Sequence, residues 1–161
     1  MKYLLCSIIM TAMLFSCTSE NVEGYVIIDT SMEIIVKDKD GSDLLNPDNE
    51  NSLNTNLVKI YYEIGGKKIE VNEPHLDNPK GFSIFCKDNQ YRIGIGPNTD
   101  RNEEYPLTYI EWNPDDTDTI KCLIERAKSR NGNSTICRKV WFNGKVVWDD
   151  YGVERSFVIV K

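Results

Sequence analysis

The sequence predicts an all-β fold, a two-layer antiparallel β-sandwich with an immunoglobulin-like arrangement. Two observations support this prediction. Short segments rich in β-branched and aromatic residues recur along the chain, and Gly, Pro, Asn or Asp residues separate them. Several segments alternate apolar and polar residues, as a strand does when it buries one face. A partly open β-barrel is the alternative arrangement.

The expected strands run through the chain at short, regular intervals. In chain order, after a first strand near residue 26, they cover residues 31–37, 57–64, 67–71, 81–87, 91–95, 107–112, 117–125, 135–142, 145–148 and 156–160. The alternation is clean in the segment 31–37, where Met32, Ile34 and Val36 share one face. Gly65-Gly66 can adopt the positive φ angles of a tight turn, so we expect a hairpin there.

The first seventeen residues predict export and lipid attachment. Lys2 precedes an uncharged apolar run that ends at Phe15, and this run is shorter than the roughly 20 residues that a membrane-spanning helix needs. Leu14-Phe15-Ser16 before Cys17 resembles the bacterial lipobox, in which the cysteine becomes the lipid-modified first residue. We therefore expect a signal peptide over 1–16, the lipidated Cys17 and a tether over 17–24, and one β-sandwich domain over 25–161.

Composition argues against several classes of partner. The chain carries 19 basic and 25 acidic residues, a net charge of −6, which does not suit nucleic acid or an anionic lipid surface. It has one histidine and no CxxC motif, so we expect no zinc site and no cofactor. The acidic clusters 38–43 and 115–118 depart from the spacing of a calcium-binding EF-hand loop, and we interpret them as turns.

Three segments, read together with the lipobox, resemble small uncharacterised lipoproteins of the Bacteroidetes. They are Lys-Asp-Lys-Asp-Gly-Ser-Asp-Leu-Leu-Asn-Pro at 37–47, Asp-Thr-Asp-Thr-Ile-Lys at 116–121 and Val-Trp-Phe-Asn-Gly at 140–144. The resemblance implies a protein of the cell envelope, in the outer membrane and facing the periplasm or the surface, and implies no known activity. Thr119, within Asp-Thr-Ile, matches the short O-glycosylation pattern attributed to exported proteins of this group; a buried strand start is the alternative.

The three cysteines of the expected domain are not expected to form a disulfide. Setting Ile120 opposite Val140 pairs apolar residues across the two strands that carry Cys122 and Cys137, and this register turns Cys137 away from Cys122. Cys86 shares a face with apolar neighbours, so we expect it to be buried.

A hairpin at Asn143-Gly144 carries the candidate binding surface. Regular alternation through a two-residue turn places Trp141, Val146 and Trp148 on an outward face and puts Val147 on the core face. Aromatic side chains can stack on sugars and are enriched at protein interfaces. The alternative is that a loop or the final strand covers this face.

We therefore predict a non-catalytic binding module for an envelope protein or a glycan. A structural or accessory subunit of a surface assembly is the first alternative. A hydrolase is a more distant one, because His75 lies in a proline-flanked loop without a nucleophile motif, and the side chains of Glu103 and Glu104 would diverge on a strand.

Overall fold

The structure, a computed structural model, describes residues 24–129, 131–149 and 152–161. The predicted signal peptide, Cys17 and most of the tether lie outside the described residues. The described part of the chain forms eleven strands and one 3₁₀ turn. The strands are β1 (Tyr25–Asp29), β2 (Met32–Lys37), β3 (Lys59–Ile64), β4 (Lys67–Glu70), β5 (Phe82–Lys87), β6 (Gln90–Ile95), β7 (Leu107–Asn113), β8 (Asp116–Ser129), β9 (Gly132–Phe142), β10 (Lys145–Trp148) and β11 (Ser156–Val160), and the 3₁₀ turn is Thr55–Leu57.

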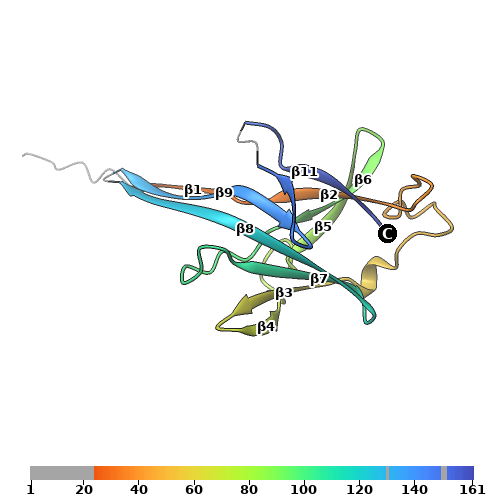
Figure 1. The fold of residues 1–161 in the computed structure, drawn as a ribbon, viewed down its shortest axis with the longest axis horizontal. Helices are drawn as coiled ribbons and strands as arrows, with labels where there is room; N and C mark the ends of the chain where they lie inside the picture. The colour runs from red at the N-terminus through yellow and green to blue at the C-terminus, as the bar shows by residue number, and fades with distance from the viewer. Residues whose placement is uncertain (1–23, 130, 150–151) are drawn as a thin grey trace, which may run out of the picture.

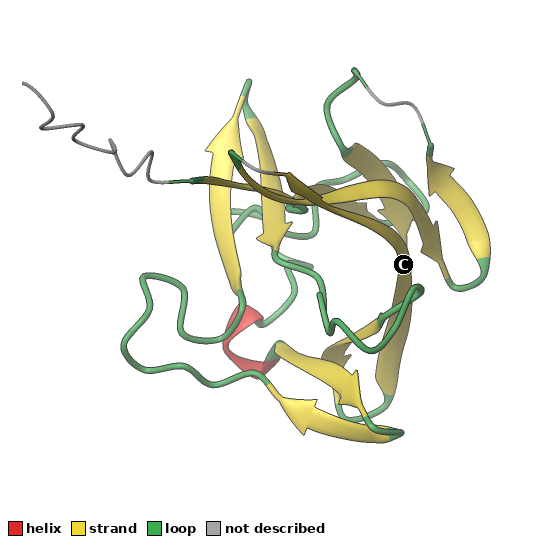
Figure 2. Ribbon diagram, turned by 90° about the vertical axis from the view of Figure 1, so that its left-hand side faces the viewer, coloured by secondary structure: helices red, strands yellow, loops and turns green. Residues whose placement is uncertain are grey.

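The strands form two sheets that do not close into a barrel. One sheet has the order β1-β9-β8-β7-β3-β4, with β10 also pairing β9, and the other has the order β11-β2-β6-β5. Viewed from the end of the molecule, the strands surround a common interior (Figure 2). The predicted all-β sandwich is thus confirmed.

The expectation that every strand pair is antiparallel was wrong. β1 pairs parallel with β9, and β11 pairs parallel with β2. Both are edge strands at the two ends of the described chain, and each pairs with a strand to which no tight hairpin joins it. Because a hairpin fixes antiparallel pairing and these strands have none, their direction depends on tertiary packing.

The core lies between the sheets and follows the predicted alternation. Met32, Ile34 and Val36 are all buried on the inward face of β2, as expected. The most completely buried large side chains from the other strands and from the residue before β3 are Val58, Ile60, Ile93, Ile95, Ile110, Trp112, Ile120 and Val140. These residues come from both sheets, so burial of their apolar surface holds the two layers together.

The tight turns match their sequences. Gly65 and Gly66 have φ angles of 57° and 74°, and Asn143 and Gly144 have 48° and 79°. The turn between β5 and β6 also has positive φ at both of its residues. Positive φ at both central positions is the geometry of a type I′ turn, whose twist suits a two-residue hairpin. The hairpins predicted at Gly65-Gly66 and Asn143-Gly144 are confirmed.

Three strands extend together as an arm beyond the rest of the domain (Figure 1). β8 and β9 are longer than the sequence predicts, and β1 lies along the distal part of β9. All five residues of β1 are exposed. The arm therefore brings the start of the described chain to a point remote from the core.

A β-bulge in β10 overturns the predicted outward face of its hairpin. Val146 lies opposite Trp141 as expected, but the register then shifts at Val147, and Trp148 lies opposite the buried Val140. One extra residue reverses the side on which the following side chain points. Trp148 is consequently only 7% exposed and belongs to the core, whereas Val146 remains outside.

A second bulge overturns the predicted environment of the cysteines. Cys122 lies opposite Val140, and the shifted register next places Ile124 opposite Cys137, so both thiols face the core. The hydrogen bond with the Cys137 thiol, together with burial, raises the pKa of the Cys122 thiol. The two cysteines are free thiols in the structure. Cys86, the residue before the last one in β5, is exposed rather than buried, so the prediction for it was wrong.

Candidate functional site

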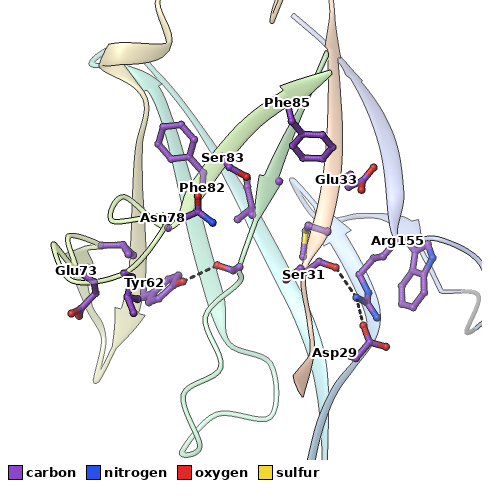
Figure 3. Close-up of a pocket in the computed structure, with 18 of the residues that line it drawn as sticks. Asp29, Ser31, Glu33, Tyr62, Glu73, Asn78, Phe82, Ser83, Phe85 and Arg155 are labelled. Atoms are coloured by element: carbon purple, nitrogen blue, oxygen red, sulfur yellow. Dashed lines mark hydrogen bonds and ion pairs between the residues drawn. The ribbon is translucent and has the colours of Figure 1, made fainter. Parts of the chain in front are cut away.

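A cleft of about 1060 Å³ is lined by residues from both sheets (Figure 3). β3 and β4 contribute residues on one side, and β2, β5 and β6 contribute residues on the other. Asp29 of β1, Trp148 of β10, the loop between β4 and β5 and the segment that leads into β11 complete the lining. A concave site of this size, built from several elements, is the kind of place where proteins bind ligands.

The cleft has an apolar lining that continues onto an exposed rim. Phe82 is half-buried, while Ile69, Leu76 and Val153 are exposed. Gly94 leaves room for the Phe85 ring, because a Cβ at Gly94 would lie 3.1 Å from that ring. These exposed aliphatic side chains are gathered around one cavity rather than scattered singly, a pattern that marks interaction sites in many proteins.

Acidic side chains outnumber basic ones around the cleft. The lining contains five carboxylates and one guanidinium; the carboxylates are Asp29, Glu33, Glu70, Glu73 and Glu154. Arg92 contacts Glu33 at 2.6 Å, and Lys87 contacts Glu154. The hydrogen bond from Lys87 lowers the pKa of the Glu154 carboxyl, so this carboxylate remains charged at neutral pH. Glu70 lies 3.5 Å from Lys59 and Asp29 lies 3.2 Å from Arg155, so four of the five carboxylates already face basic side chains and the cleft carries little net charge.

Arg155 forms one wall of the cleft and connects the two sheets. Its Nη1 donates to the Ser31 carbonyl at 2.7 Å and to Asp29 at 3.2 Å, and its Nη2 donates to the Cys137 carbonyl at 3.0 Å. The guanidinium also lies over the Trp148 ring, 4.5 Å from its centroid. Arg155 therefore holds β1, the start of β2 and β9 together beside the cleft (Figure 3).

The same wall contains two hydrogen-bond donors that have no acceptor among the described residues. They are Arg155 Nε and Trp148 Nε1, and both are buried. Buried donors are normally paired with protein or water. Both donor atoms have almost no solvent-exposed surface and lie inside the wall rather than on its surface.

The surface predicted around Trp141 is only partly assembled. Trp141 is half-buried, Val146 is exposed beside it, and Trp148 is absent from this face because of the bulge. Tyr105 meets the Trp141 ring edge-on at 6.0 Å. The ammonium groups of Lys121 and Lys139 lie 4.6 and 5.5 Å from the ring centroid of Trp141. Side chains already occupy the space around the indole, so it is not a free platform for a sugar ring.

Thr119, the predicted O-glycosylation site, is half-buried within β8. Its backbone N–H donates to the Asn143 side chain at 2.9 Å, and its carbonyl accepts from the Asn143 N–H at 2.8 Å. The preceding Asp118 is buried and accepts hydrogen bonds from Trp112 and Asn143. Asp118 thus has a structural role, and glycosylation of Thr119 stays a prediction.

The other groups considered from the sequence lie apart from the cleft's polar wall. His75 is exposed in the loop between β4 and β5 and lies 3.8 Å from Glu73. Asp38 accepts from two backbone N–H groups of its own turn, as the turn interpretation expects. Within the residues that the structure describes, no three His, Cys, Asp or Glu side chains are placed to hold a metal ion. No helix in the same residues is long and apolar enough to cross a membrane.

Compared with known proteins, the chain matches no family model, no curated protein and no solved structure. The basis for a functional proposal is therefore the sequence and the geometry of the cleft. Sequence reasoning missed the cleft because its lining comes from segments more than 100 residues apart, such as Asp29 and Arg155. The exposed Ile69, on a short hairpin strand beside a proline-containing loop, was the available signal.

Proposed function

We propose that this protein is a lipid-anchored, non-catalytic binding module of the cell envelope, and that the cleft binds a segment of a partner protein. The observation that carries the proposal is the apolar, acid-lined cleft between the two sheets. The proposed localisation in the cell envelope is supported by the apolar N-terminal segment that ends at Cys17 and by the resemblance to Bacteroidetes lipoproteins.

A polypeptide segment suits the cleft better than other ligand classes. The exposed aliphatic side chains of the rim favour an apolar partner. We expect a partner segment whose aliphatic side chains contact this rim.

A glycan is the second candidate, supported by a different part of the lining. The Phe82 and Phe85 rings lie near the polar side chains of Asn78 and Ser83 (Figure 3). Rings beside hydroxyl and amide groups can stack on a sugar and bond its hydroxyls. In this case, aliphatic rim residues would matter less than the two phenylalanines.

Leu76→Lys should weaken capture of the partner at least tenfold, because it removes an apolar contact and places a charged group in the apolar rim. The measurement is cross-linking of the full-length protein in native envelopes, followed by identification and quantification of the captured protein. Leu57→Lys is the matched control, since Leu57 is 48% exposed and Leu76 is 53% exposed, and Leu57 does not line the cleft.

Two results would contradict the cleft as the partner site. One is equal capture by the Leu76→Lys and wild-type proteins, and the other is an equal loss with Leu57→Lys. Loss of binding to purified envelope glycan, measured with a Phe82→Ala variant whose protein capture is unchanged, would instead support the second candidate.

Cys17→Ala should release the protein from the membrane fraction, because the proposed acyl chains contribute about 0.8 kcal/mol for each buried CH₂ group. Fractionation of cells, with a second envelope lipoprotein as the loading control, measures the change. Continued sedimentation with membranes after the substitution would overturn the anchor. In the anchored protein the tether would join the arm at β1. The longest arm strand, β8, has 14 residues and is roughly 46 Å long at about 3.3 Å a residue.

A further inference from the structure

Strand β1 is a free edge whose apolar side chains the domain does not bury. Its first four residues, Tyr-Val-Ile-Ile, are between 46% and 71% exposed. β1 pairs with β9 along one side and ends the sheet on the other. Natural edge strands usually carry a lysine, a proline or a bulge that prevents further pairing, and Tyr25–Ile28 carries none of these. Such an edge is suited to pairing with another strand.

The backbone of β1 offers hydrogen-bonding groups on that free side. Tyr25 N–H donates to the Asn131 carbonyl at 3.0 Å, which directs the backbone groups of Tyr25 and Ile27 toward β9. Alternation then directs the N–H and C=O groups of Val26 and Ile28 away from β9. No described residue outside the sheet bonds these groups.

We infer that β1 pairs antiparallel with β1 of a second copy of this chain, about a two-fold axis at Ile27. Val26 would then exchange both backbone hydrogen bonds with Ile28 of the second copy, while the two Ile27 side chains would face each other. Asp29, the only charged residue of the strand, would lie opposite the uncharged Tyr25. The strand is therefore self-complementary, with apolar pairs in the middle and no like charges opposed.

The packing of β1 against β9 fixes the position of β1 at the edge of the arm. The Tyr25 ring lies over Gly132, where an added Cβ would come within 2.8 Å of the ring and 2.3 Å of the Tyr25 carbonyl oxygen. Glycine at this position allows β1 to lie against β9. Because each copy uses its one free β1 edge, the pairing closes as a dimer and does not propagate into a fibre.

The interface is small, so we expect a weak dimer. Five residues a strand bury less than the roughly 800 Å² for each partner that a standard interface buries. A dissociation constant on the order of 1–100 µM follows for this class of contact. The inference does not depend on the cleft or on the lipid anchor.

Sedimentation velocity of the full-length protein in detergent, over about 5–500 µM, tests the dimer. The wild-type protein should change from monomer to dimer across this range. Ile27→Lys should stay monomeric, because it opposes two ammonium groups at the axis. Val158→Lys is the matched control and should dimerise, since Val158 is 52% exposed on the edge strand β11 and Ile27 is 46% exposed. Gly132→Ala should also weaken the dimer by displacing β1.

Variants of opposite charge at Ile27 show whether a loss of dimer comes from the β1–β1 contact itself or from disruption of the arm. Ile27→Glu alone should be monomeric, and an equimolar mixture of the Ile27→Lys and Ile27→Glu proteins should form a mixed dimer. A wild-type protein that is monomeric at every concentration would overturn the inference, as would an Ile27→Lys protein that dimerises normally or a mixture that stays monomeric. A wild-type monomer that binds a strand of another protein along β1 would overturn it in favour of that partner.

Discussion

Replacing Asp118 with alanine is expected to lower the free energy of unfolding by about 3 kcal/mol, because three donors lose a buried acceptor. Trp112 Nε1 donates to Asp118 Oδ2 at 2.7 Å, and Asn143 Nδ2 donates to Oδ1 at 2.6 Å. Lys161, next to β11, donates to the same carboxylate. Asp118 therefore connects the core, the β9–β10 turn and the second sheet through one side chain.

Urea unfolding followed by tryptophan fluorescence measures this change. Asp116→Ala is the control, because Asp116 contacts the same Lys161 at 2.7 Å but is more exposed than Asp118. We expect it to cost about 1 kcal/mol or less. Equal losses for the two variants would show that the buried contacts of Asp118 with Trp112 and Asn143 contribute nothing beyond the ion pair.

The same carboxylate makes stability depend on pH in the acid range. Burial raises the pKa of Asp118, but hydrogen bonds from Lys161, Asn143 and Trp112 outweigh it, and the net shift is below the usual 3.8. A lowered pKa in the folded state contributes stability above the unfolded pKa, and that contribution is lost as the pH falls through the folded pKa. The difference in stability between wild type and Asp118→Ala should therefore shrink below about pH 4.

Arg155→Ala is expected to lower the free energy of unfolding by about 3 kcal/mol. The guanidinium is buried, and its loss leaves the Ser31 and Cys137 carbonyls and the Asp29 carboxylate without this donor. It also removes the group that packs on the Trp148 ring. Denaturant unfolding measures the loss, and hydrogen exchange should show it first in β1 and at the cleft.

Arg155→Lys distinguishes charge from geometry. A lysine keeps the positive charge but lacks the planar fork that reaches three separate acceptors, so we expect it to recover less than half of the lost stability. The exposed Arg101 provides the control, and Arg101→Ala should change stability by no more than about 0.5 kcal/mol. If Arg155→Lys were as stable as wild type, the fork would not be what connects the sheets.

Local sequence was sufficient to predict most strands and the tight turns. The alternation of Met32, Ile34 and Val36 depends on which side chains a single strand can bury, and the structure confirms it. The turns at Gly65-Gly66 and Asn143-Gly144 depend on residues that tolerate positive φ. Both kinds of information are contained in a few neighbouring residues.

The candidate site was much harder to predict. The cleft needs Arg155 beside Asp29, residues 126 positions apart in the chain, and it opens between sheets whose order no turn reveals. The position of Trp148 depended on one extra residue, Val147, that breaks the hairpin register. A bulge leaves no local signature here, because Val147 suits a regular strand equally well.

By itself the sequence determined the all-β character, the inward face of each regularly alternating strand, the turns and the prediction of an exported, lipid-modified chain. Only the tertiary structure decided that β1 and β11 join their sheets in parallel, that Trp148 and Cys137 face the core, and that five carboxylates line one cleft. The physical reason is the separation in sequence between the residues that interact. Alternation and turn geometry are set by adjacent residues, whereas register shifts, edge pairing and clefts depend on contacts between segments distant in the chain.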